Sequence, residues 1–168
     1  MNKERRKAVN IFMRSAALAI ALVFLCAPPL ARATDYSITP GSVIASAQAR
    51  KVTGTAGATI TAGQLVYLDP VTNTYKLADA NGASPLYKVA GIALNGASSG
   101  QRITVCTSDP SFTPGTAVNP GEVFIASATP GGIAPFSDAA TGWFVTVLGP
   151  GIGSNKIKLD PFRSNTAK

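Results

Sequence analysis

The sequence predicts an all-β protein, a compact barrel or sandwich built from two similar β units and preceded by an N-terminal signal or hydrophobic helix. Short stretches rich in β-branched and aromatic residues recur between Gly, Pro, Asn and Asp turns from Thr59 onward. With 16 glycines and 12 prolines, no segment after residue 33 keeps the 3.6-residue apolar period of a helix. A strand phrase at Gly63 returns at Gly121.

Residues 1–33 have the order of a secretory signal. The basic stretch "MNKERRKAVNIFMR" precedes the apolar run "SAALAIALVFLCAPPLA", and the small residues Ala31 and Ala33 stand at positions −3 and −1 before Thr34. The apolar run is about 15 residues long, whereas a spanning helix needs roughly 20. We expect a cleaved signal peptide, with a retained N-terminal anchor as the alternative, and no stable membrane span in the mature form.

Removing this segment changes the charge. The chain carries 15 basic and 8 acidic residues. Six of the basic residues and one acidic residue lie in residues 1–33, which leaves nine against seven, a net charge of +2. A nucleic-acid-binding surface combines a basic stripe with interleaved aromatic residues, whereas the remaining charges are scattered singly. We expect no nucleic-acid partner.

The rest of the chain divides into two parts. Residues 34–58 are rich in small and polar side chains and are expected as an extended arm, with an edge strand as the alternative. Residues 59–168 are expected as a β-domain with two repeat units, 59–109 and 115–162.

The predicted strands follow the same order in both repeat units. "QLVYLD", "TYKLAD", "LYKVAGIAL" and "RITVCTS" in the first unit are followed by "GEVFIAS", "TPGGIAPFSDAATG", "WFVTVLG" and "NKIKLDP" in the second. The offset is 58 from Gly63 to Gly121 and 54 from Ile103 to Ile157. Internal similarity at such a period indicates a duplicated unit whose turns differ in length, with chance similarity of Gly-rich strands as the alternative. Each unit has one apolar face that it cannot bury alone, so the two are expected to pack together.

Few residues carry reactive chemistry. Histidine is absent, which removes the commonest general base and zinc ligand. Cys106 is the only cysteine after residue 33, so an internal disulfide is impossible there. Its strand-like setting favours a buried apolar side chain over a reactive thiol. We expect no catalytic, cofactor-binding or metal-binding residues, and no enzymatic activity.

The carboxylates fit structural roles. Asp69, Asp109 and Asp160 each precede proline, which predicts turn residues at strand ends. Asp79 and Asp138 lie at matching places in the two units, which predicts one structural hydrogen bond in both copies. "DPVTNTYKLAD" has too few carboxylates for a calcium loop, and "GPGIGS" is expected as a hairpin loop because it lacks the lysine and helix of a phosphate-binding loop.

Two aromatic residues are singled out. Trp143 opens the predicted strand "WFVTVLG" and is expected in the core. Tyr36 lies in the predicted arm, where little surrounds it that could form a core, so it is the better candidate for an interface.

The phrases "ITAGQLVYLD", "KVAGIALNGASSGQRITV", "GEVFIAS" and "ATGWFVTVLG" resemble those of small β proteins of tailed phages, the capsid decoration (cement) and head-fibre proteins. The resemblance covers residues 57–161. It implies a non-enzymatic virion protein with a compact β-domain, often a homotrimer, that binds the major capsid protein and stabilises or decorates the virion surface.

Two functions follow as expectations. The first is a structural, capsid-decoration or head-fibre-like protein that acts as an oligomer on a virion surface. The alternative, suggested by the signal, is an exported β-domain, secreted or periplasmic, that binds a carbohydrate or cell-surface ligand. Sugar sites use exposed aromatic rings beside acids, and Trp143, Tyr87 and Asp138 are the available set.

Overall fold

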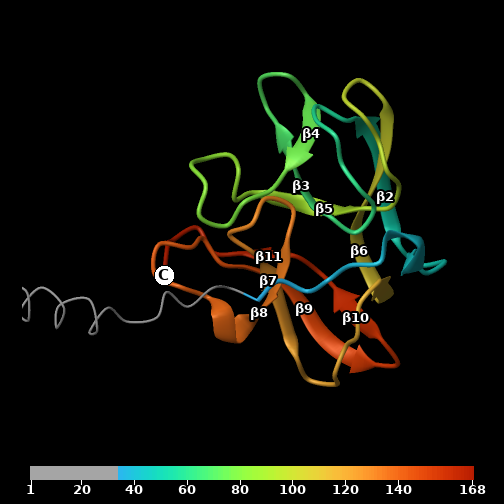
Figure 1. Cartoon of the computed structure of the whole chain (residues 1–168), viewed down its shortest axis with the longest axis vertical. Coiled ribbons are helices and arrows are strands. Elements are labelled where there is room, and N and C mark those ends of the chain that lie inside the picture. Colours follow the sequence, from blue (N-terminus) through green and yellow to red (C-terminus); the bar gives the residue numbers. More distant parts are fainter. Residues whose placement is uncertain (1–33) are drawn as a thin grey trace, which may run out of the picture. The chain divides into compact units, whose positions relative to one another are not determined.

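The computed structural model describes residues 34–168, so the predicted signal or hydrophobic helix at 1–33 lies outside the described residues. Within residues 34–168 the chain is all-β, and its antiparallel sheet curls into a half-barrel (Figure 1). The elements are, in order, η1 (Pro40–Ser42), β1 (Val43–Ile44), β2 (Arg50–Thr55), β3 (Leu65–Asp69), β4 (Thr74–Leu77), β5 (Val89–Ala93), β6 (Arg102–Pro114), β7 (Val123–Ala126), β8 (Ile133–Pro135), η2 (Phe136–Asp138), β9 (Thr146–Gly153), β10 (Lys156–Leu159) and β11 (Phe162–Arg163).

Two sets of three strands pair in the same register. Val66 of β3 lies opposite Leu77 of β4, and the pair 58 residues later, Phe124 and Pro135, lies between β7 and β8. The same shift relates every pair of β3 with β5 to a pair of β7 with β9. The sheet order β4-β3-β5-β6-β10-β9-β7-β8 therefore places two similarly paired sets on either side of β6 and β10.

Both sets also contain the same irregularity in the ladder. The register shifts after Val66 in the first set and after Phe124 in the second. The residues opposite are Gly91 and Gly149. A Cβ added to Gly91 would lie 2.2 Å from the Cys106 carbonyl oxygen, and one added to Gly149 would lie 1.8 Å from that of Lys158. Only glycine lets these backbones approach so closely.

The phrase that recurs in the sequence forms a tight turn before each set. The amide of Gln64 donates to the carbonyl of Thr61 (3.2 Å), and the amide of Glu122 donates to that of Asn119 (3.2 Å). The third residue of each turn has positive φ, +92° at Gly63 and +81° at Gly121, as a type II turn requires. The two turns therefore lead into equivalent strands, β3 and β7.

The last strands differ from the sequence-based register. Val105 pairs with Ala93, and Ile157 pairs with Gly151, so Ile157 corresponds to Val105 rather than to Ile103, at an offset of 52. The reason is the shorter second connection, since β9 runs on to Gly153 and leaves two loop residues. These are Ser154 and Asn155, with φ of 53° and 57°, the geometry of a type I′ hairpin. Most of "GPGIGS" is therefore strand rather than loop.

Strand β6 links the two sets. Its first half pairs with β5 and β2, and its second half pairs with β10 and β1. Asp109 lies in the middle of this 13-residue strand. The prediction of a turn residue at a strand end is therefore wrong for Asp109, because the chain continues through Pro110 as a strand that changes its neighbours.

Residues 34–58, expected as an arm, contribute strands to the sheet. All six residues of β2 pair with β6. Beyond β2, Ala56 forms a parallel bridge with Tyr75 of β4, and the amide of Gly57 donates to the Tyr75 carbonyl (2.7 Å). The pairings β4-β3-β5-β6-β2 thereby return to β4, and we call these five strands the first unit.

The second unit consists of β7–β10 with the second half of β6. Residues 34–44, which we call the N-terminal segment, lie along it. The amide of Tyr36 donates to the carbonyl of Ile133 in β8 (2.9 Å), and the amide of Thr39 donates to that of Gly115 just after β6 (2.8 Å). β1 then pairs with the end of β6. The N-terminal segment therefore connects β8 with β6.

Two apolar clusters form the core. Alternate residues of one strand belong to different clusters, as Val66 and its neighbours Leu65 and Tyr67 show. The smaller cluster lies inside the first unit, and the larger one joins the opposite face of β3 and β5 to the second unit. Because both faces of β3 are buried, its sequence "LVYLD" is almost continuously apolar.

Candidate interaction surfaces

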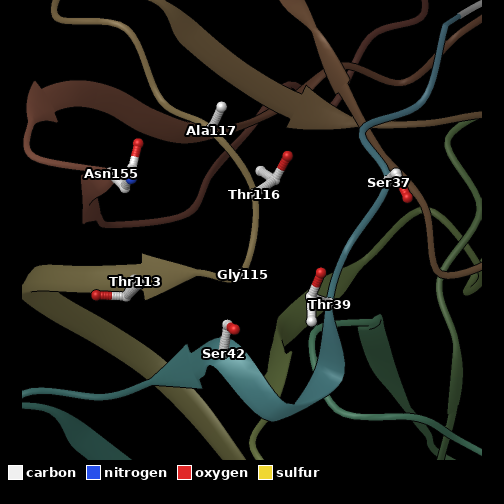
Figure 2. A pocket seen from close by; sticks show the side chains of 8 residues that line it. All are labelled: Ser37, Thr39, Ser42, Thr113, Gly115, Thr116, Ala117 and Asn155. Atoms are coloured by element: carbon white, nitrogen blue, oxygen red, sulfur yellow. The ribbon is translucent and has the colours of Figure 1, made fainter.

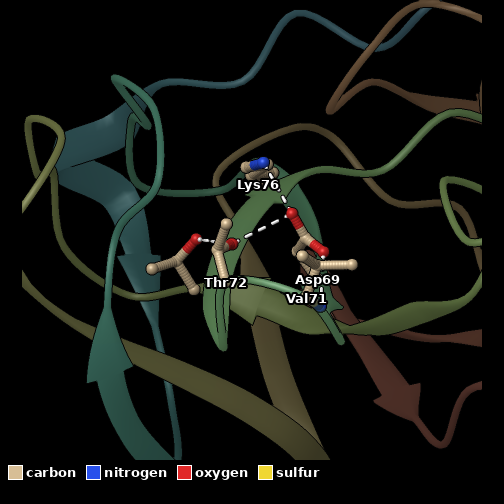
Figure 3. A network of polar contacts seen from close by, with 5 residues as sticks. Asp69, Val71, Thr72 and Lys76 are labelled. Carbon is tan, nitrogen blue, oxygen red and sulfur yellow. Dashed lines mark hydrogen bonds and ion pairs between the residues drawn. The ribbon is translucent and has the colours of Figure 1, made fainter.

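Asp69 holds the β3–β4 hairpin together (Figure 3). Its carboxylate accepts hydrogen bonds from the Lys76 ammonium (2.6 Å), the Val71 amide (2.9 Å) and the Thr72 hydroxyl (2.9 Å). The hydrogen bond from Lys76 is the largest cause that lowers the pKa of Asp69 well below its usual range, and the bonds from Val71 and Thr72 add to it. Asp69 is thus a turn residue at the end of β3, as the sequence predicts.

Asp109 is buried at the point where β6 changes its neighbours. Burial alone would raise the pKa of Asp109, but hydrogen bonds from the Ser46 hydroxyl and from the amides of Ser46 and Ser111 outweigh it and lower this pKa. The donors lie 2.5, 2.6 and 2.8 Å from the carboxylate oxygens, in that order. Asp109 therefore ties the residues before β2 to β6, a role that sequence reasoning missed.

The other carboxylates with predicted structural roles are Asp160, Asp79 and Asp138. Asp160 directly follows β10 and is exposed. Asp79 accepts a hydrogen bond from the amide of Asn81 (3.1 Å), whereas Asp138 accepts one from the amide of Thr34 (2.7 Å). The prediction of one shared hydrogen bond is wrong, because the 58-residue shift places Ser137 rather than Asp138 at the position of Asp79.

Cys106 is fully buried, and its thiol lies 3.6 Å from the Ser108 carbonyl oxygen. Burial raises the pKa of Cys106 to about 11. The thiolate is the nucleophilic form, so this residue stays a protonated, apolar side chain at neutral pH. The expectation of a buried apolar cysteine is confirmed.

Of the three residues considered for a sugar site, Trp143 is buried rather than exposed. Trp143 is 7% exposed and packs in the larger cluster, as expected, although β9 begins only at Thr146. The half-buried ring of Tyr87 stacks on Phe144 with centroids 3.9 Å apart. The third member of the set, Asp138, binds Thr34 as described above.

Tyr36, the predicted interface residue, packs within its own chain. The centroid of its ring lies 4.8 Å from that of the Phe124 ring, and its hydroxyl donates to the Glu122 carboxylate. Burial is the largest cause that raises the pKa of Tyr36, followed by the bond to Glu122. Tyr36 therefore fixes the N-terminal segment to β7.

Two surface clefts border the N-terminal segment. One, of about 360 Å³, lies between the N-terminal segment, the end of β6 and the β9–β10 hairpin (Figure 2). Hydroxyl groups and one amide side chain supply its polar atoms, and none of the residues from 34 to 168 that line it has a titratable side chain. Its lining consists of Ser37, Thr39, Ser42, Thr113, Gly115, Thr116, Ala117 and Asn155.

A second cleft, of about 290 Å³, lies between the N-terminal segment and the turns before β3 and β8. Asp35 lines it beside Thr61, Gln64 and Thr129. One carboxylate oxygen of Asp35 is buried and has no hydrogen-bond partner among the described residues. Within residues 34–168 no group of three or more acidic, cysteine or histidine side chains is placed to hold a metal ion.

Several large apolar side chains point to solvent. Val71, at the tip of the β3–β4 hairpin, is 90% exposed, and Phe162 of β11 is 74% exposed. The others are Ile44, Val52, Leu68, Phe136 and Ile152. In the part of the chain that the structure describes, no helix has the length and apolar character needed to cross a membrane.

No protein-family model, curated protein or solved structure shows a significant match to this chain.

Proposed function

We propose that this chain is a non-enzymatic structural protein, similar to capsid decoration or head-fibre proteins, that acts as an oligomer on a virion surface. The observation that carries the proposal is the use of its distinctive phrases in the fold. "AGQLVYLD" and "NPGEVFIA" form the turns at Gly63 and Gly121 and the buried strands behind them. Since these phrases serve the architecture of two similar β units, binding is left to the outer surface.

The exposed apolar side chains support assembly. Val71 lies at a hairpin tip and Phe162 on a strand near the C-terminus. The Val71 methyl groups and the Phe162 ring both face solvent in the single chain. Burying them against neighbouring copies or a shell removes apolar area from water at about 25 cal/mol per Å². We propose that the partners are further copies of this chain, as a homotrimer, and the major capsid protein.

Light scattering during size-exclusion chromatography tests the oligomer. We expect the mature protein to elute with three times the subunit mass, and Val71→Asp combined with Phe162→Asp to lower that mass. Ser99→Asp is the matched control, because Ser99 is exposed and polar. A mature protein that stays monomeric at high concentration contradicts the proposal.

Co-sedimentation tests the capsid partner. The probe is an empty shell assembled from the major capsid protein encoded in the same genome. We expect the wild type and Ser99→Asp to pellet with the shells at a fixed ratio, and the double variant at Val71 and Phe162 to bind less. Equal recovery with and without shells contradicts the virion location.

The alternative is an exported β-domain, secreted or periplasmic, that binds a carbohydrate. The observation that favours it is the stacked pair of Tyr87 and Phe144, both half-buried, with the Lys88 ammonium 6.0 Å from the Tyr87 ring centroid. Such a platform suits the flat face of a sugar ring. A glycan array in which the wild type binds and Tyr87→Ala does not would support it, and an array without hits removes it.

A further inference from the structure

The first described residue makes a specific contact. The backbone nitrogen of Thr34 lies 2.7 Å from one carboxylate oxygen of Asp138 in η2, 104 residues away in the sequence. The other carboxylate oxygen of Asp138 accepts a hydrogen bond from the Ser137 hydroxyl (3.2 Å). Asp138 thus offers an anionic acceptor at the start of the N-terminal segment.

The peptide bond between Ala33 and Thr34, which contains this nitrogen, also stands out in the sequence for an unrelated reason. Ala31 and Ala33 occupy positions −3 and −1 of a signal-peptidase site, so the predicted cut falls between Ala33 and Thr34. Hydrolysis breaks that C–N bond, adds the hydroxyl of water to the Ala33 carbonyl carbon and leaves the proton on the Thr34 nitrogen. The atom that donates to Asp138 then becomes the α-amino group of the mature protein.

We propose that Asp138 is the binding site for the α-ammonium group that processing releases at Thr34. A peptide N–H supplies one neutral donor, whereas an ammonium supplies three donors and a positive charge. A hydrogen bond with an ionised donor or acceptor is roughly twice as strong as a neutral one, and the Asp138 carboxylate already supplies one of the two charges. Cleavage therefore adds a positive charge to the donor and converts a hydrogen bond with one charged partner into an ion pair at the start of the N-terminal segment.

The rest of this segment is already fixed at the required position. The amide of Tyr36 donates to Ile133 (2.9 Å), and the Tyr36 ring lies 4.8 Å from that of Phe124. Because these contacts lie two residues from Thr34, the new terminus has little freedom to lose on binding. The ion pair then secures the first residue of a segment that connects β8 with β6.

Other charged groups bear on the same terminus. Asp35 is adjacent on the segment, and Glu122 of the second unit binds the Tyr36 hydroxyl. Both carboxylates favour the charged amine. The Lys168 ammonium, which donates to the carbonyl of Ala139 (2.5 Å), opposes it. Since the contact is exposed, salt weakens the pairing.

The proposed ion pair makes the stability of the mature protein depend on pH. An α-amino group in an unfolded chain has a pKa of about 7.7–8.0, and pairing with Asp138 raises it in the folded state. The stabilisation is therefore fully present below about pH 7.7 and is lost as the pH rises through the higher folded value.

The experiment uses the mature protein purified after export of the full chain. Intact mass and N-terminal sequencing are expected to give Thr34 as the first residue. The pKa of its α-amine, followed by NMR titration, is expected to correspond to about two- to fivefold tighter proton binding than in an unfolded peptide of the same sequence. Asp138→Asn should abolish that difference.

Asp79→Asn is the matched control, since among the described residues the Asp79 carboxylate accepts a hydrogen bond only from the amide of Asn81 in its own loop. It should leave the amine pKa unchanged. A mature terminus other than Thr34 overturns the proposal, and so does an amine whose pKa is the same in the wild type and in Asp138→Asn. The titration also gives a readout when Asp138→Asn folds less well, because the wild-type value alone must exceed that of the unfolded peptide.

Discussion

In the first unit the outer edge of β4 is covered by the residues that follow β2, whereas in the second unit the outer edge of β8 is covered by the N-terminal segment. The amide of Gly57 donates to the Tyr75 carbonyl (2.7 Å), and the amide of Tyr36 donates to the Ile133 carbonyl (2.9 Å). Tyr75 and Ile133 are 58 residues apart, so the two amides fill equivalent positions from different parts of the chain.

The difference arises because β6 serves both units. Strand β2 pairs with the first half of β6, but the second half of β6 itself takes the corresponding place beside β10. The second half of β6 does not pair with β8, and residues 34–44 connect the two strands instead. Two units with the same internal register can therefore depend on the rest of the chain in different ways.

The largest loss of stability is expected at Gly91 and Gly149, the equivalent glycines of the two units. Gly91→Ala and Gly149→Ala each place a methyl group within 2.2 Å of a carbonyl oxygen, and neither backbone can retreat without breaking the ladder. We expect each to lower the free energy of unfolding by at least about 3 kcal/mol or to prevent folding. Chemical denaturation measures it, and a variant that unfolds like the wild type contradicts the equivalence of the two units.

An intermediate effect separates the two turns. Gly121→Ala has open space around it and meets only the strain of its positive φ, which costs about 1 kcal/mol. Gly63→Ala has the same strain and also meets the Ile38 side chain at 2.4 Å, within the N-terminal segment. We expect Gly63→Ala to be roughly twice as destabilising in thermal unfolding. Equal losses would mean that the N-terminal segment does not press on the first unit.

The smallest effect is a pH dependence confined to the first unit. The folded pKa of Asp69 lies below its unfolded value of about 3.9. Its contribution is therefore complete above about pH 4 and is lost as the pH falls through the folded pKa. We expect Asp69→Asn to lose less stability than the wild type between pH 5 and pH 2, measured by urea midpoints. Identical acid profiles would contradict a stabilising role for the Lys76–Asp69 pair.

Local patterns were enough to predict the all-β class and the strand entries. Positive φ at Gly63 and Gly121 follows from turn chemistry that four residues define. The buried Cys106 and Trp143 likewise follow from their neighbours in the sequence. These features depend on short-range steric and packing preferences, which one strand and its turns already contain.

Long-range partners could not be predicted in this way. Asp109 looked like a turn residue because Asp-Pro usually begins a turn, but hydrogen bonds from Ser46, 63 residues earlier, hold it inside β6. Tyr36 looked free because its neighbours in sequence are polar, yet Phe124 and Glu122 surround it. The sequence contains no signal for either pairing beyond the residue types themselves.

Hydrogen exchange in Tyr36→Ala tests most directly whether the N-terminal segment is part of the second unit. Removing the ring leaves a gap against Phe124 and loosens the cover of β8. Amides of β7 and β8 are expected to exchange about tenfold faster than in the wild type, while those of β3 and β4 keep their rates. Ser99→Ala, exposed in the loop before β6 of the first unit, should change neither set. Unchanged exchange in β7 and β8, or an equal increase in both units, would mean that the N-terminal segment is not part of the second unit.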